Sequence, residues 1–258
     1  MPVEFDGKRY EQTSAHQKEW GTRLIHELKL RGDEHILDVG CGDGALTAKL
    51  AEVVPEGSVM GIDASEGMIR TAQSHQNNNL SFQQLDVMSI HFYEKFDFVF
   101  SNAALHWVKD HNTLLGLLYR ALKPSGVLRA NFAGDGNCST FNRIVKELMN
   151  HDEFRDAFEG FEWPWYMPGI DEYTGLLKRS PFRHAEVWGE NADRYFPDAN
   201  AMLDWIDHPA IVPFRQYLEH DMAERFHKMV ADFMVEETKQ NDGTCFEMFR
   251  RVNVLAQK

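Results

Sequence analysis

A regular alternation of strand-like and helix-like segments over roughly the first 135 residues limits this chain to very few folds. The strand-like segments are short runs rich in β-branched and aromatic residues, and most of them end near a glycine or an aspartate. The segments between them have apolar residues at helical spacing. This order predicts a parallel sheet with helices on both faces, and right-handed crossovers then determine most of the topology. The strand-like runs are residues 35–39, 58–62, 80–85, 96–100 and 127–132.

The pattern changes after Gly136, where helical spacing becomes dominant. An aromatic loop and two further strand-like runs interrupt the helical segments. Because the last run can return to the first sheet, we expect one domain rather than two. The helical segments are 141–149, 199–206 and 214–239, the loop is 161–168, and the strands are 184–188 and 246–255.

We therefore expect an α/β fold with a doubly wound, mostly parallel sheet of seven strands and a helical lid inserted in the C-terminal half. Residues 1–136 would form the ligand-binding half of the core, with an N-terminal helical cap. Residues 137–258 would supply the last two core strands and the lid. The two lid insertions are expected at about 137–180 and 196–242.

Composition excludes several classes of function. The net charge of −13 over 258 residues disfavours nucleic acid as a partner. No apolar run reaches the roughly 20 residues of a membrane span, and the polar N-terminus does not resemble a signal peptide. The three cysteines form no C-x-x-C pair, and the histidines show no metal-binding spacing, so we expect a cytoplasmic protein without a metal. Monomer and homodimer both remain open.

The chemistry-bearing residues follow the expected strands. Gly40-x-Gly42-x-Gly44 stands between a strand and a helix, where glycines permit a tight turn and close approach to a ligand. With Ala45 it also satisfies the dinucleotide pattern, so a nicotinamide cofactor and a plain turn stay open on this motif alone. Asp63 ends the second strand, where a carboxylate can accept both hydroxyls of a ribose. Asp86 after the third strand and Asp38 before the loop are not part of the dinucleotide pattern.

Taken together, the successive motifs resemble those of class I S-adenosylmethionine-dependent methyltransferases, over about residues 10–135. Within that superfamily the chain is similar to the small-molecule branch of trans-aconitate and malonyl-carrier-protein methyltransferases. The narrower likeness rests on residues 101–108, on Tyr10-x-x-x-Ser14-x-x-Gln17 and on residues 202–206. The broader motifs are ILDVGCGDG (36–44), GIDASEGM (61–68), LDV (85–87), FDFVFSNAALHWV (96–108) and LKPSGVL (122–128).

The resemblance implies a Rossmann-like fold and S-adenosyl-L-methionine as cofactor, with S-adenosyl-L-homocysteine as product. Asp38 would help to hold the cofactor's ammonium group, Asp63 its ribose hydroxyls and Asp86 its adenine amino group. The N-terminal helix around Gln17 would close over the site. The residues that the resemblance assigns to the cofactor are Gln17, Asp38, Gly40, Gly42, Asp63, Ala64, Met68, Asp86, Val87, Ser101 and Asn102.

His106, after the fourth strand, is the candidate catalytic residue, because histidine titrates in the range that suits a general base. A structural histidine is the alternative. The first hypothesis for the small-molecule acceptor is a carboxylic acid, which would give a methyl ester. Alcohol, amine, carbon and carrier-bound acyl acceptors remain open. Two other functions also remain open, a nicotinamide-dependent oxidoreductase and a non-catalytic S-adenosyl-binding protein. Candidate carboxylate ligands are Arg143, Arg179, Arg183 and Arg194, and candidate substrate residues are Tyr10, Trp107, Asn131, Trp163 and Tyr166.

Overall fold

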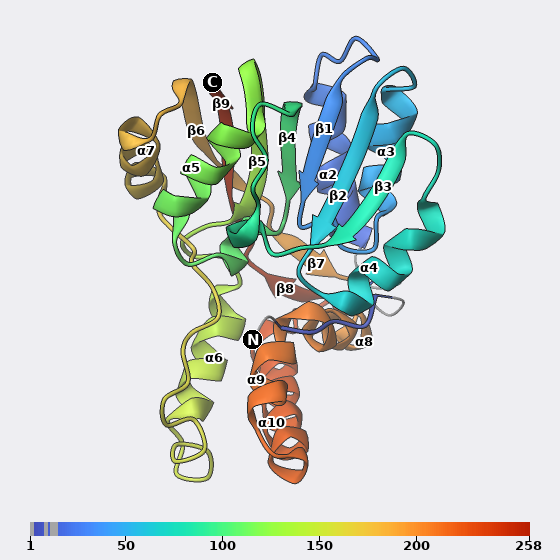
Figure 1. Ribbon diagram of the computed structural model, residues 1–258. Coiled ribbons are helices and arrows are strands. Elements are labelled where there is room, and N and C mark those ends of the chain that lie inside the picture. The colour runs from blue at the N-terminus through green and yellow to red at the C-terminus, as the bar shows by residue number, and fades with distance from the viewer. Residues whose placement is uncertain (1–2, 8–9, 11–14) are drawn as a thin grey trace. The chain divides into compact units, whose positions relative to one another are not determined.

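Seven strands form the central sheet of the computed structural model, in the order β3-β2-β1-β4-β5-β9-β6 (Figure 1). The structure describes residues 3–7, 10 and 15–258. β1 pairs in parallel with β2 and β4, β2 with β3, and β4 with β5, whereas β9 runs antiparallel to β5. The strands are β1 (His35–Val39), β2 (Ser58–Asp63), β3 (Leu80–Gln84), β4 (Phe96–Asn102), β5 (Leu122–Ala133), β6 (Arg183–Asn191) and β9 (Arg250–Gln257).

The chain divides into two compact units. The sheet unit comprises residues 2–135, 165–190 and 251–258, and the helical unit comprises residues 136–164 and 191–250. The helices of the sheet unit are α2 (Ala15–Glu27), α3 (Ala45–Val53), α4 (Glu66–Ala72), α5 (His111–Ala121) and α7 (Ile170–Arg179), with short helices η1 (Gln73–His75), η2 (Val87–Ser89) and η3 (Leu105–Trp107). The seven-stranded, mostly parallel α/β sheet predicted from the sequence is confirmed.

Two apolar clusters bury the two faces of the sheet. Helices α5 and α7 contribute Leu118 and Tyr173 to one cluster, and α2 and α3 contribute Leu24 and Leu50 to the other. Because both faces are covered, β1 is buried along almost its whole length, as expected of a central parallel strand. All the parallel strands therefore end at one edge, and the loops at that edge are free to carry chemistry.

Helix starts follow local chemistry. The Ser65 hydroxyl accepts a hydrogen bond from the Met68 backbone N–H and so begins α4, as the sequence predicts. Asp110 begins α5 in the same way through the Thr113 N–H.

The helical unit differs from its sequence-based prediction in two places. Residues 214–239 do not form one helix: the backbone of Leu218 is extended and separates α9 from α10. Each of these helices buries one apolar face, so the apolar residues of 214–239 keep helical spacing across the break. The elements of this unit are α6 (Ser139–Met149), β7 (Arg194–Phe196), α8 (Ala199–Trp205), η4 (Ile206–Ala210), α9 (Val212–Tyr217), α10 (His220–Thr238) and β8 (Cys245–Glu247).

The expected final strand, 246–255, is also divided. Its first part is β8, which pairs with β7 in a separate two-stranded sheet, and its second part is β9 in the main sheet. Residues 165–180, expected in the lid, group with the sheet unit, because α7 buries Tyr173 and Leu177 in its core. That the helical unit acts as a lid stays a prediction.

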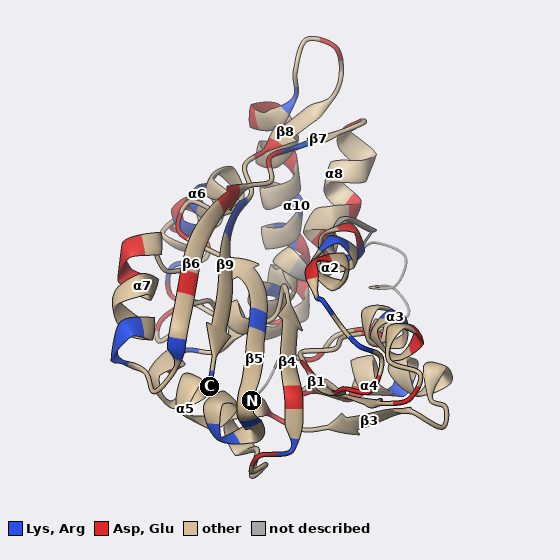
Figure 2. Cartoon of the chain, turned by 90° about the horizontal axis from the view of Figure 1, so that it is seen from above, with Lys and Arg blue, Asp and Glu red and all other residues tan. Residues whose placement is uncertain are grey.

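Acidic and basic residues both occur on helices of each unit (Figure 2). Among the described residues, no helix is both long and apolar enough to span a membrane.

Candidate active site

The glycine loop connects β1 to α3 at the carboxyl edge of the sheet. Gly40, Gly42 and Gly44 have positive φ angles of 71°, 55° and 81°. The backbone N–H groups of Gly40 and Cys41 both donate to the Ile62 carbonyl, at 2.8 and 3.0 Å, which fixes the loop to the end of β2. A Cβ on Gly40 would lie 2.1 Å from that of Ala104, so only glycine fits there.

Asp63 joins this loop to α4. Its Oδ2 accepts from the Gly42 N–H at 3.0 Å, and its Oδ1 accepts from the Ser65 N–H at 2.9 Å. Burial raises the pKa of Asp63, although these two hydrogen bonds oppose the rise. Each carboxylate oxygen can accept a second hydrogen bond, so the group can still receive hydroxyls from a ligand.

Asp38 lies behind the glycine loop and is only 2% exposed. Its Oδ2 accepts from the Thr47 hydroxyl at 2.7 Å. Burial, offset by this hydrogen bond and reinforced by the charge of Asp63, raises the pKa of Asp38 to about 7. A carboxyl group in this state would be ionised by a cation placed beside it, and therefore suits an ammonium ligand.

The residues expected around an adenine lie after β2 and β3. Asp86 is exposed, and its Oδ1 accepts from the Met88 N–H at 2.8 Å, which begins η2. Val87 and Met68 are buried, and Ala64 is half-buried. The structure thus places an acidic side chain after each of two neighbouring strands, with apolar groups beside them.

The N-terminal segment supplies residues that sequence reasoning missed. Glu4 accepts from the Gly67 N–H at 2.6 Å and from the Ser65 hydroxyl at 2.9 Å. The ring of Phe5 lies 5.5 Å from that of Trp107, edge to face. No spacing or motif marks these two residues, because their role depends on the path of the chain back to α4.

Tyr10 lies beside the glycine loop, and its predicted contact with substrate stays a prediction. Its Cε1 is 3.7 Å from the point where a Cβ on Gly42 would stand. Burial raises the pKa of Tyr10, as do the charges of Asp43 and Asp63. The side chain of Gln17 lies outside the described residues, so its predicted contact stays a prediction.

Two residues at the end of β4 have different surroundings. Ser101 is fully buried, and its hydroxyl donates to the Val39 carbonyl at 2.8 Å, which ties β4 to β1. This contact favours a structural role for its side chain over the predicted cofactor contact. Asn102 faces α2, and its Nδ2 lies 3.1 Å from the point where a Cβ on Gly21 would stand.

His106 lies in η3, directly after β4. Its carbonyl accepts from the Tyr166 N–H at 2.8 Å, and its buried Nδ1 makes no hydrogen bond within the part of the chain that the structure describes. Burial, followed by the positive charge of Arg251 and by His111, lowers the pKa of His106 to about 3. The imidazole is therefore neutral at physiological pH.

A short aromatic network supports the loop that carries His106. The ring of Trp107 lies 5.6 Å from that of Trp165, and Lys109 donates to the Trp165 carbonyl at 3.2 Å. Tyr166 packs 4.7 Å from the ring of His111. The Tyr166 hydroxyl donates to Glu172 at 2.7 Å, and burial raises its pKa to about 12.

Trp163, expected to share a substrate pocket with Tyr166, belongs to the helical unit. There its ring lies 5.5 Å from that of Phe214 and 4.7 Å from the Lys146 ammonium.

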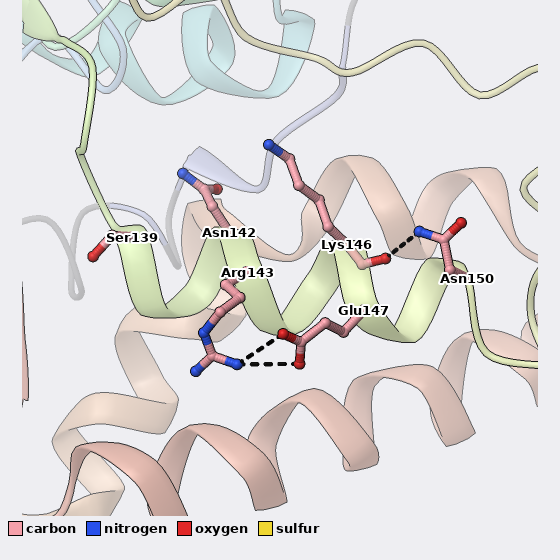
Figure 3. Close-up of a pocket in the computed structure, with 6 residues that line it drawn as sticks. All are labelled: Ser139, Asn142, Arg143, Lys146, Glu147 and Asn150. Carbon is pink, nitrogen blue, oxygen red and sulfur yellow. Dashed lines mark hydrogen bonds and ion pairs between the residues drawn. The ribbon is translucent and has the colours of Figure 1, made fainter.

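Of the candidate carboxylate ligands, Arg179 ends α7 and Arg183 begins β6 in the sheet unit, whereas Arg143 and Arg194 belong to the helical unit. Arg143 lies on α6 of the helical unit, where Figure 3 shows its guanidinium turned toward Glu147, at 3.0 and 3.1 Å. Arg143 also pairs with Glu237 on α10, and such ion pairs between exposed side chains are typical of a solvated surface. The hollow around it has a volume of about 590 Å³ and is lined by Ser139, Asn142, Arg143, Lys146, Glu147 and Asn150.

Asn131, at the end of β5, is 1% exposed, and both ends of its side-chain amide are engaged. Its Oδ1 accepts from Arg251 Nε at 2.8 Å, and its Nδ2 donates to Asn253 Oδ1 at 2.9 Å. Sequence reasoning missed Arg251, because only the antiparallel pairing of the last strand brings it to this edge.

The chain is similar to known methyltransferases in sequence and in fold. The profile of the methyltransferase-domain family matches residues 30–177. The trans-aconitate 2-methyltransferase of Deinococcus radiodurans is 31% identical over 198 residues, covering 74% of each chain. The enzyme of the same name from Acidovorax ebreus is 25% identical over 99% of this chain and 98% of its own. The phosphoethanolamine N-methyltransferase 2 of Haemonchus contortus, solved with S-adenosyl-L-methionine, aligns with a TM-score of 0.62 at 19% identity, over 98% of this chain and 56% of its own.

The residues present fit S-adenosylmethionine as cofactor. Gly42 leaves room where a side chain would otherwise stand, and a buried carboxyl at Asp38 is suited to an ammonium group. Asp63 ends the next strand, and Asp86 follows the strand after it, a position that the dinucleotide alternative does not explain. The chain belongs to the class I S-adenosylmethionine-dependent methyltransferases, in the branch that contains the trans-aconitate methyltransferases.

Proposed function

We propose that this enzyme methylates a carboxylate group of a small organic acid to give a methyl ester. Its relatives named trans-aconitate 2-methyltransferase support an acid as acceptor. S-adenosylmethionine supplies a methyl group on a sulfonium, so that the new O–C bond forms as the S–C bond breaks and the electron pair stays on sulfur. A carboxylate is already ionised at neutral pH, and no proton has to be removed from it.

The state of His106 is the observation that carries this proposal. An alcohol or amine acceptor generally needs a base whose pKa lies near the working pH. Burial and Arg251 lower the pKa of His106 to about 3, which makes it a weak base. An acceptor that arrives without a proton to lose is therefore the better match.

The residues of the sheet unit would then act by binding and orientation. Asp38 would hold the cofactor's ammonium group, Asp63 its ribose hydroxyls, and Asp86 its adenine amino group. The backbone of the glycine loop would accept the methionyl part. Alignment of donor and acceptor in this manner can contribute about 7–11 kcal/mol to lowering the barrier.

The chemistry of the product tests the proposal. The purified enzyme would be incubated with methyl-labelled S-adenosylmethionine and a panel of acids that includes trans-aconitate, together with matched alcohols and amines. We expect label that is released as methanol by mild alkali, as from a methyl ester. Alkali-stable label from the alcohols or amines alone would contradict the proposal.

Replacing His106 tests the same conclusion from the enzyme side. Because no proton has to move, His106→Gln should keep turnover within about tenfold of wild type, and both enzymes should lack a rate-controlling group with a pKa near 6.5. Turnover across pH 5–8 with S-adenosylmethionine and acceptor at saturation measures this, because saturation removes the effect of Asp38 on cofactor affinity. A loss of about 100-fold or more in His106→Gln, with binding of S-adenosylhomocysteine intact, would instead assign His106 the role of a general base.

A further inference from the structure

The N-terminal residues lie against the start of α4. Glu4 Oε1 accepts from the Gly67 N–H at 2.6 Å and from the Ser65 hydroxyl at 2.9 Å, and its Oε2 accepts from the Glu66 N–H at 3.2 Å. The first N–H groups of a helix have no partner inside that helix. Glu4 therefore completes, from a distant part of the chain, the cap that Ser65 begins.

Two glycines make room for this contact. A Cβ on Gly67 would lie 2.2 Å from the Phe5 carbonyl oxygen, and a Cβ on Gly7 would lie 2.7 Å from the Gly67 carbonyl oxygen. Both neighbours are backbone atoms, which cannot rotate away as the end of a side chain can. Only glycine fits at these positions while the N-terminal residues keep this path, so their backbone is closely packed on α4.

The same part of the chain also contacts two other loops of the site. The ring of Phe5 lies 5.5 Å from that of Trp107, in the loop after β4, and Tyr10 stands beside Gly42. Both loops and the start of α4 lie at the carboxyl edge of the parallel strands. The resemblance assigns none of these N-terminal residues to the cofactor. We define the N-terminal clasp as Glu4, Phe5, Gly7 and Tyr10.

The contacts of Glu4 continue to a residue that is assigned to the cofactor. The Ser65 N–H donates to Asp63 Oδ1 at 2.9 Å, and the Gly42 N–H donates to Asp63 Oδ2 at 3.0 Å. Met68, also assigned to the cofactor, follows Gly67 directly. Release of Glu4 would therefore loosen the start of α4 next to Asp63 and Met68.

We infer that Glu4 is a positioning residue that holds the N-terminal clasp closed over the bound cofactor, so that cofactor and product leave only when the contacts of Glu4 open. Its charged carboxylate accepts stronger hydrogen bonds than a neutral group would. Its side chain is exposed, so water takes the place of the lost donors and opening is reversible. The inference goes beyond the proposed function, because it holds for any acceptor.

The dissociation of labelled S-adenosylhomocysteine tests this role. Each enzyme is loaded with the labelled compound and then mixed with an excess of unlabelled compound. Glu4→Ala should raise the dissociation rate about 3- to 10-fold and lower the affinity by the same factor. Glu4→Gln keeps one acceptor oxygen and should have an intermediate rate. Glu66→Ala is the matched control: Glu66 is exposed at the same helix start but pairs with Arg70 at 2.6 Å, so the rate should not change.

A second variant opens the clasp by different means. Gly7→Ala adds a methyl group that pushes the clasp away from α4, and it should raise the dissociation rate as Glu4→Ala does. Its control is Gly116→Ala, where nothing lies within 4 Å of the added methyl group. Hydrogen exchange of the ligand-free enzyme gives an independent readout, since the Glu66 and Gly67 amides should exchange faster in Glu4→Ala.

The two readouts together decide the inference. Faster amide exchange in Glu4→Ala, with wild-type dissociation rates in both Glu4→Ala and Gly7→Ala, would show that Glu4 only caps α4 and would overturn the inference. Unchanged amide exchange would overturn it too, because the contact itself would then be absent. Neither measurement uses an acceptor. If the enzyme esterifies no acid, the proposed function fails while this inference stands or falls on its own result.

Discussion

Asp38 shows how one residue can combine a structural cost with a binding role. Its carboxyl group is buried, accepts a hydrogen bond from the Thr47 hydroxyl, and has a pKa raised to about 7. Ionising it in the free protein is unfavourable, because the charge has left water. A cofactor ammonium group placed beside Asp38 would make ionisation of its carboxyl favourable.

Binding of S-adenosylhomocysteine should therefore be coupled to proton release from Asp38. Between pH 6 and 7 affinity should rise by up to tenfold, because the ligand favours the ionised carboxylate. Above about pH 8 the ligand's own amino group loses its proton, and the gain ends. Calorimetric titration in buffers of different ionisation enthalpy measures the protons released.

Two variants check that assignment. Asp38→Asn should abolish the proton release, and Thr47→Val should move its midpoint to higher pH, since the Thr47 hydroxyl lowers the pKa of Asp38. Unchanged proton release in Asp38→Asn would assign the linkage to another group.

At the scale of elements, α7 shows why part of the expected lid belongs to the sheet unit. Tyr173 is fully buried, and its hydroxyl lies 3.0 Å from Nδ1 of His111 on α5. The other ring nitrogen of His111 faces the Leu105 carbonyl at 3.0 Å and therefore carries the proton. Tyr173 thus donates to Nδ1, and η3, α5 and α7 are joined beneath the His106 loop.

Removing this hydroxyl tests the joint. Tyr173→Phe should lower the free energy of unfolding by about 1–3 kcal/mol, because it deletes one hydrogen bond and leaves a buried nitrogen unsatisfied. Urea unfolding followed by circular dichroism measures the change. Tyr93→Phe, at a side chain that is 74% exposed, is the matched control and should change stability by less than about 0.5 kcal/mol. Equal free energies of unfolding for the two variants would show that the Tyr173–His111 hydrogen bond does not stabilise the fold.

At the scale of the whole molecule, buried titratable groups make stability depend on pH. The folded pKa values of His106 and His111 are lowered to about 3 and 4, so between these values and about 6.5 the unfolded chain binds more protons. Their contribution to stability is present above pH 6.5 and is lost as the pH falls. Asp38 acts in the opposite sense, because its raised pKa stabilises the fold below about pH 4 and this contribution is lost as the pH rises through 7.

From these directions we expect the free energy of unfolding to fall by about 1–2 kcal/mol between pH 7 and pH 5. In Asp38→Asn the opposing contribution is absent, and the fall should reach about 4 kcal/mol. Denaturant titrations at the two pH values measure both. A smaller fall in the variant than in wild type would contradict the assigned direction for Asp38.

Local sequence by itself determined the cofactor half of this protein. The glycine loop, Asp38, Asp63 and Asp86 each follow or end a strand, and parallel strands must bring their carboxyl ends to one edge. Short-range signals such as the Ser65 cap placed the helices between them. The cofactor could be predicted because the residues assigned to it stand at fixed offsets from these elements.

Tertiary structure alone decided what surrounds His106. Arg251 lies 120 residues from Asn131 in the chain, and only the antiparallel register of β9 brings the two together. Burial, which the spacing of residues in the sequence does not reveal, keeps His106 neutral. Packing of α7 against α5 brings the Tyr173 hydroxyl to His111. Residues 214–239 and 246–255 each read as one element, because apolar periodicity records which face is buried and not where the backbone turns.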